Sequence, residues 1–98
     1  MKLVIPACGE YITSKYCPDF EECEYLIIYD TKTKQYASRK SPSFYSKNPE
    51  DLKKFLKAIM IKNIITGKDL DDKYFKIFKL KDKNLTVEEA IIKYKEES

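Results

Sequence analysis

The chain has 98 residues, of which 43% are hydrophobic, 13% aromatic and 36% charged, and its formal net charge is +3. This length and apolar content predict one globular domain over residues 1–98 and leave no room for a second. The 19 basic and 16 acidic residues are intermixed, which argues against the single-sign surface that a nucleic acid backbone selects. We therefore expect no nucleic-acid partner.

The start of the chain bears on its compartment. The apolar segment 2–6 is far shorter than the hydrophobic region of a signal peptide or a membrane span. We therefore expect a cytoplasmic protein with no membrane partner. The abundance of lysine and glutamate, with Gln35 as the only glutamine, is typical of thermophile proteins and weakly indicates such a source.

The first third of the chain predicts three strands. Leu3, Val4 and Ile5 form a continuous apolar run that a proline ends, as in a buried strand over 2–6. A second apolar run covers 25–29, and a polar segment then returns the chain into 35–39. This order predicts an antiparallel hairpin of the second and third strands.

A helix start follows a polar loop. Asn48 is a preferred N-cap, Pro49 fits the first helical turn, and Glu50 and Asp51 favour the positive end of the helix dipole. Apolar residues then recur with helical spacing, which predicts one buried face formed by Leu52, Phe55, Leu56, Ile59 and Met60.

The remaining segments predict two more strands and two more helices. A fourth strand at 64–66 after the helix implies a crossover and parallel pairing. Residues 69–74 have room for about one helical turn before a fifth strand at 76–80. Thr86 and Glu89 match a capping box that begins a C-terminal helix. We expect an α/β fold of at most three layers, with a five-stranded mixed sheet, two main helices and one short helix.

In this order, the segments MKLVIP, FEECEYLIIYD, IITG and LTVEEAIIKYKEE resemble the dinitrogenase iron-molybdenum cofactor biosynthesis domain family, which includes nitrogenase cofactor carriers. The resemblance covers almost the whole chain. It implies a ribonuclease H-like three-layer fold with strand order 3-2-1-4-5, strand two antiparallel to the others, and no nuclease activity. It also implies a role in binding or carrying a metallocluster.

The family typically carries a Ser-x-His-Phe-Gly pattern before its second strand, and this chain departs from it. The alignment places Cys17 at the serine, Asp19 at the histidine, Phe20 at the phenylalanine and Glu21 at the glycine, with Cys23 at a small residue. Only the phenylalanine is kept. The resemblance thus makes Asp19 a secondary candidate ligand.

The three cysteines are the main candidate site. The chain has no histidine, so any metal or redox chemistry depends on sulfur. Cys8 follows the first strand, Cys23 precedes the second, and Cys17 lies between them, so antiparallel pairing of these strands predicts three sulfurs at one edge of the sheet. Three thiolates suit an iron-sulfur or iron-molybdenum type cluster or a soft metal, with Asp19 or an exogenous ligand completing the shell.

Other interpretations of the cysteines stay open at this point. Cys8 and Cys23 are also consistent with small buried core residues, and Cys17 with a surface thiol, because a C-x5-C spacing is not diagnostic of a metal site. A disulfide between two of the three is a further alternative. A catalytic cysteine is disfavoured, because no histidine is present to activate it.

Two hypotheses of function follow. The first is a non-enzymatic metallocluster-binding or carrier protein that uses Cys8, Cys17 and Cys23, and whose partners are metallocluster donor or acceptor proteins. The alternative is a protein-interaction or regulatory module that keeps only the fold. Exposed edges at the third or fifth strand would permit a weak homodimer, so we expect a monomer or a weak dimer.

Overall fold

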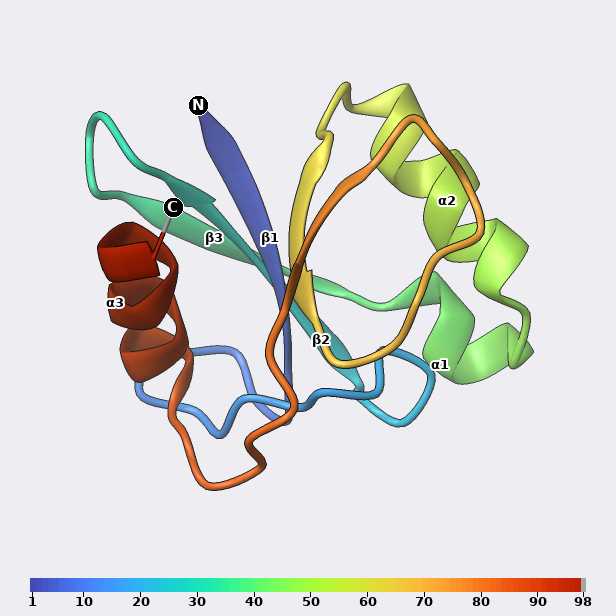
Figure 1. Ribbon diagram of the computed structural model, residues 1–98. Helices are drawn as coiled ribbons and strands as arrows, with labels where there is room; N and C mark the ends of the chain where they lie inside the picture. Colours follow the sequence, from blue (N-terminus) through green and yellow to red (C-terminus); the bar gives the residue numbers. More distant parts are fainter. Residues whose placement is uncertain (98) are drawn as a thin grey trace.

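The apolar run that begins at Leu3 forms the central strand of a five-stranded sheet (Figure 1). The structure is a computed structural model in which residues 1–97 are described. The strands, in chain order, are β1 Lys2–Ala7, β2 Tyr25–Asp30, β3 Tyr36–Lys40, β4 Asn63–Thr66 and β5 Lys76–Lys79. The helices are α1 Pro42–Ser46, α2 Pro49–Ala58 and α3 Val87–Glu97.

The sheet topology confirms the predicted fold class. Its strand order is β3-β2-β1-β4-β5. β1 pairs antiparallel with β2 and parallel with β4, and β4 pairs parallel with β5. β2 also pairs antiparallel with β3, so β2 is the strand that runs against the other four.

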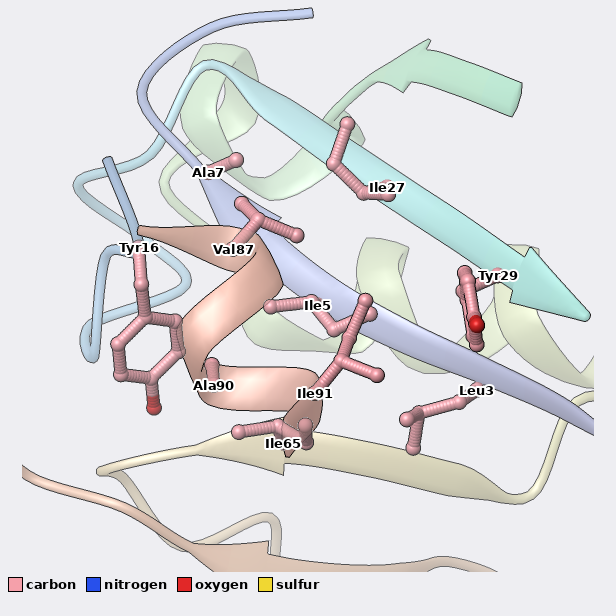
Figure 2. Packing of buried hydrophobic residues seen from close by; sticks show 10 residues of the cluster. All are labelled: Leu3, Ile5, Ala7, Tyr16, Ile27, Tyr29, Ile65, Val87, Ala90 and Ile91. Atoms are coloured by element: carbon pink, nitrogen blue, oxygen red, sulfur yellow. The ribbon is translucent and has the colours of Figure 1, made fainter. Parts of the chain in front are cut away.

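Helices cover both faces of this sheet. α3 packs on one face, and α1 and α2 pack on the other (Figure 1). Because side chains alternate along a strand, Leu3 and Ile5 of β1 point toward α3, while Val4 points toward α2. Figure 2 shows Leu3, Ile5 and Ala7 facing Val87, Ala90 and Ile91 of α3. The central strand therefore contributes to both halves of the core.

α2 begins as predicted but ends earlier than its apolar pattern indicates. Asn48 accepts a hydrogen bond from the Glu50 amide at 3.0 Å. The helix ends at Ala58, because Met60 takes a left-handed conformation and the Ile61 amide bonds back to the Leu56 carbonyl at 2.9 Å. This Schellman-type ending turns Ile61 into the core. The predicted buried face was wrong at its end: Ile59 and Met60 are 40% and 82% exposed.

The predicted short helix at residues 69–74 was also wrong. The Asp72 side chain there accepts from the Tyr74 amide at 2.9 Å and pairs with Lys57 at 2.6 Å, so a local turn replaces the helical turn. The short helix is α1, which begins at Pro42 in a segment expected to be a polar loop. None of the helices described in residues 1–97 is long and apolar enough to cross a membrane.

The C-terminal helix follows its predicted capping box. The Glu89 carboxylate accepts from the Thr86 amide at 3.0 Å, and the Thr86 hydroxyl accepts from the Glu89 amide at 3.2 Å. These two bonds satisfy amides that the first helical turn leaves free. Ala90 and Ile91 then bury their side chains against the sheet.

The long connection between β1 and β2 is fastened to the sheet at several points. Ala7 and Tyr16 form an antiparallel bridge. The Pro18 carbonyl accepts two hydrogen bonds from the end of β4, from the Thr66 hydroxyl at 2.7 Å and from the Gly67 amide at 2.8 Å. Gly67 lies so close that a β-carbon there would meet the Pro18 Cβ at 2.8 Å. This contact fixes where the cysteine-bearing connection crosses the sheet edge.

We predict that Leu56→Ala destabilises the protein by about 2–5 kcal/mol, because it removes a fully buried side chain at the end of α2 and leaves a cavity. Urea unfolding followed by circular dichroism measures the change. The matched control is Lys54→Ala on the exposed side of the same helix, which should stay within about 0.5 kcal/mol of wild type. Equal effects of the two variants would contradict this packing.

We predict that Gly67→Ala lowers the free energy of unfolding by about 1–3 kcal/mol, because the added methyl group meets the Pro18 Cβ and the Leu80 carbonyl oxygen. Gly9→Ala is the control. Its methyl group meets the Ser14 hydroxyl at 2.6 Å, and rotation of that hydroxyl relieves the contact at the cost of one exposed hydrogen bond from the Tyr11 amide. Urea unfolding of both variants compares them, and a Gly67→Ala protein as stable as Gly9→Ala would show that the connection is not held as described.

Candidate functional site

Backbone pairing brings the first two cysteines together at one end of the sheet. The Cys8 amide donates to the Lys15 carbonyl at 2.9 Å, and the Cys17 amide donates to the Pro6 carbonyl at 3.1 Å. These bonds flank the Ala7 and Tyr16 bridge and extend β1 by a short antiparallel ladder. Alternation along this ladder places Cys8 and Cys17 on one face as diagonal neighbours. It is the α2 face, because Ala7 and Tyr16 pack toward α3.

The third cysteine lies beneath this ladder. Cys23 is fully buried in the core between the sheet and α2, and its thiol donates to the Phe20 carbonyl at 3.2 Å. Cys17 is half-buried and contacts the Asp19 carbonyl through its sulfur at 3.2 Å. Cys8 is exposed. The three sulfurs therefore lie in one region and run from solvent into the core.

The thiols perturb one another electrostatically. The neighbouring Cys23 side chain is the main cause that lowers the pKa of Cys17 to about 7, and burial opposes it. The same contact and burial raise the pKa of Cys23 far above its usual value. Burial, followed by the charge of Cys17, raises the pKa of Cys8. At neutral pH the cluster thus holds one partly ionised sulfur, Cys17, between two thiols.

The Asp19 carboxylate, the secondary candidate ligand, contacts other residues of the protein and not the cysteine sulfurs. Its carboxylate accepts from the Glu21 amide at 2.9 Å and forms an ion pair with Lys68 at 3.4 Å. Lys68 also pairs with Glu21 at 3.3 Å and lies over the Phe20 ring. Asp19 therefore fastens the turn before β2 to the segment after β4.

The donor set fits a soft metal or cluster only in part. Thiolates are the ligands of iron-sulfur clusters and of soft metals, and Cys8 and Cys17 are two cysteines whose sulfurs solvent reaches. In residues 1–97, however, no three His, Cys, Asp or Glu side chains are arranged to hold a metal ion. The fold thus presents two accessible protein sulfurs, and further ligands would have to come from a bound group or a partner.

Asp69 and Asp72, which follow β4 in the chain, do not form a joint cation site. Asp69 pairs with Lys79 at 2.6 Å, whereas Asp72 pairs with Lys57 at 2.6 Å. Each carboxylate is thereby drawn to a different element.

Sequence reasoning missed two features. It treated the chain between the first two strands as a loop and did not predict the ladder that aligns Cys8 with Cys17. It also missed an apolar groove beside β3, whose lining comes from distant segments that share no motif. The cations of the predicted hairpin indicated a basic surface there, but no local pattern indicated the groove itself.

No family model and no curated protein matches the chain. Among solved structures it is similar to a Thermotoga protein described as NifB-like and assigned to the DUF35 family, with a TM-score of 0.74 and 21% identity over 98% of this chain and 88% of that one. It is also similar to the apo form of the orange protein from Desulfovibrio gigas, with a TM-score of 0.70 and 15% identity over 97% and 87% of the two chains. At these identities the likeness establishes a shared fold, which agrees with the fold that the family resemblance implies.

Proposed function

We propose that this protein is a non-enzymatic binding or carrier protein for a metallocluster of the iron-sulfur or iron-molybdenum type, and that Cys8 and Cys17 are its ligands. The observation that carries the proposal is the backbone ladder that sets the exposed Cys8 and the half-buried Cys17 on one face of the sheet. The lowered pKa of Cys17, about 7, agrees with it. A thiolate, not a thiol, is the form that binds metal. The ladder therefore presents a ligand that is already partly ionised at neutral pH.

Two protein ligands suit a carrier better than a complete shell would. A cluster held by Cys8 and Cys17 keeps its other positions open to exogenous ligands or to an accepting protein, so it can be released. Cys23 supports the site from below, because its contact with Cys17 favours the thiolate. Asp19 supports it by holding the turn through Lys68. Proteins that donate or accept clusters are the partners that this role requires.

The solved structures of the same fold agree with this role. One neighbour is described as NifB-like and another is an apo form, the term for a protein without its ligand. Non-enzymatic action is the simpler proposal, because the chain has no histidine to serve as a general base beside a cysteine.

The alternative is a protein-interaction or regulatory module that keeps only the fold. The incomplete ligand set of residues 1–97 favours it. Cluster retention separates the two candidates, because an interaction module has no reason to hold iron and sulfide on its thiols.

We predict that protein purified without oxygen from cells supplied with iron and molybdate, and then incubated with ferrous iron, sulfide and a thiol reductant, retains iron and acid-labile sulfide after desalting. The double variant Cys8→Ser, Cys17→Ser should lose both, together with the visible thiolate-to-iron absorption. Metal analysis and absorption spectra measure the retention.

Cys23→Ser separates ligand from support, because it removes the buried sulfur while its hydroxyl can still donate to the Phe20 carbonyl. It should retain iron and sulfide, because Cys23 supports the thiolate of Cys17 and is not itself a ligand. A colourless, metal-free wild type that is folded would contradict the carrier proposal, as would a folded Cys8, Cys17 double variant that keeps its iron.

The lowered pKa of Cys17 predicts a pH dependence. Because the ionised form exists above the pKa, alkylation of Cys17 by iodoacetamide should rise with pH through a midpoint near 7. Cys23→Ala removes the contact that stabilises the thiolate, so its midpoint should move toward that of a free cysteine, about 8.5. Mass spectrometry of the alkylated peptide measures both midpoints. An identical midpoint in wild type and Cys23→Ala would refute the assigned cause.

A further inference from the structure

An apolar groove lies where the sheet extends past the end of α2. It has a volume of about 210 Å³. α2 ends at Ala58, and the side chains of Ile59 and Ile61, which follow it, line one side of the groove. Its apolar lining comes from β2, β3 and the end of α2, and consists of Ile28, Ala37, Phe55, Ile59 and Ile61.

The groove opens onto an unpaired strand. β3 is the edge of the sheet and pairs only with β2, so its other side offers backbone donors and acceptors. Within β3, Ala37 pairs with Ile28 and Arg39 pairs with Leu26, so both face the α2 side of the sheet. A strand added beside β3 would therefore place alternate side chains next to the groove.

The rim of this surface is basic. Lys2 and Arg39 border the groove, and the exposed Lys32 and Lys34 lie on the hairpin turn, whose residues line the adjoining hollow. Among residues 1–97, no carboxylate lies within ion-pair distance of these four side chains. The carboxylate of Asp30 nearby accepts instead from the Lys32 amide at 2.9 Å.

We propose that the groove and the open side of β3 form a docking surface for an extended acidic segment of a partner protein. The segment adds a strand beside β3, its apolar side chains enter the groove, and its carboxylates meet Lys2, Arg39 and the hairpin lysines. This interaction goes beyond the proposed carrier function and does not depend on it.

The charge and the apolar lining of the surface favour an acidic peptide segment over a second copy of this chain and over a nucleic acid. A second copy paired through β3 would place the same cations against each other, because a two-fold interface joins identical patches. A nucleic acid would satisfy the cations but would leave the aliphatic walls of the groove unused. The carboxylates of an acidic segment would pair with the basic rim, and its branched aliphatic side chains would pack against the apolar walls.

The docking surface is separate from the cysteines. Arg39 on β3 pairs with Leu26 on β2, which pairs with Pro6 on β1, so β2 lies between the open strand and the strand that leads to Cys8. Two strand spacings of about 4.8 Å each place β3 roughly 10 Å from β1. Failure of docking can therefore be distinguished from failure of cluster binding.

The test uses a fluorescein-labelled peptide of the sequence Glu-Ile-Asp-Val-Glu-Ile-Glu-Val, titrated with the full chain and followed by anisotropy. Arg39→Glu reverses a charge at the rim of the groove, and Ile59→Asp places a charge in its apolar wall. The controls carry the same changes at exposed positions elsewhere, Lys83→Glu and Ile92→Asp. We expect the groove variants to weaken binding by about tenfold or more, and the controls to change it by less than about twofold.

The same variants should unfold at the wild-type urea concentration and retain reconstituted iron as wild type does, since both positions are exposed and lie on segments that carry no cysteine. The proposal is overturned if the peptide fails to bind at millimolar concentration, or if a peptide with lysine at every acidic position binds equally well. It is also overturned if the groove variants bind like the controls, if a single-stranded oligonucleotide binds more tightly and depends on Arg39, or if sedimentation shows a dimer that Arg39→Glu disrupts.

Discussion

The burial of β1 on both faces is the constraint on which the rest of this structure depends. Leu3 and Ile5 require a cover on one side and Val4 requires one on the other, so a three-layer arrangement follows from a single strand. The pairing of β1 with β2 and β4 at its two sides then sets the strand order. Because β1 is central, its end is also the place where the chain leaves the core with its first cysteine.

The candidate site is a consequence of that exit. The backbone of Cys8 continues the ladder of β1, and the returning chain lays Cys17 beside it. The Pro18 carbonyl, held by Thr66 and Gly67, keeps the returning chain in place, and Cys23 then enters the core. Backbone hydrogen bonds thus keep Cys8 exposed, Cys17 half-buried and Cys23 buried. The first two are the proposed ligands, and the buried third supports them.

Sequence reasoning predicted the parts of the fold that depend on local signals. The continuous apolar runs of the first two strands, the Asn48 cap and the Thr86 capping box were sufficient to predict the main elements, and the family resemblance supplied the strand order. The early end of α2 at Ala58 was missed, because the apolar pattern continues to Met60, which takes a left-handed conformation outside the helix. The ladder at Cys17 and the apolar groove were missed because they join residues far apart in the chain, which no local spacing reveals.

The account of the site rests on the separation of accessible from buried sulfur, and differential alkylation of the reconstituted protein tests it most directly. Iodoacetamide followed by peptide mass spectrometry compares each cysteine before and after cluster loading. The account predicts that Cys8 and Cys17 react in the free protein and become protected on loading, while Cys23 stays unreactive in both states because it is buried. Unchanged labelling of Cys8 and Cys17 in protein that holds iron would contradict it.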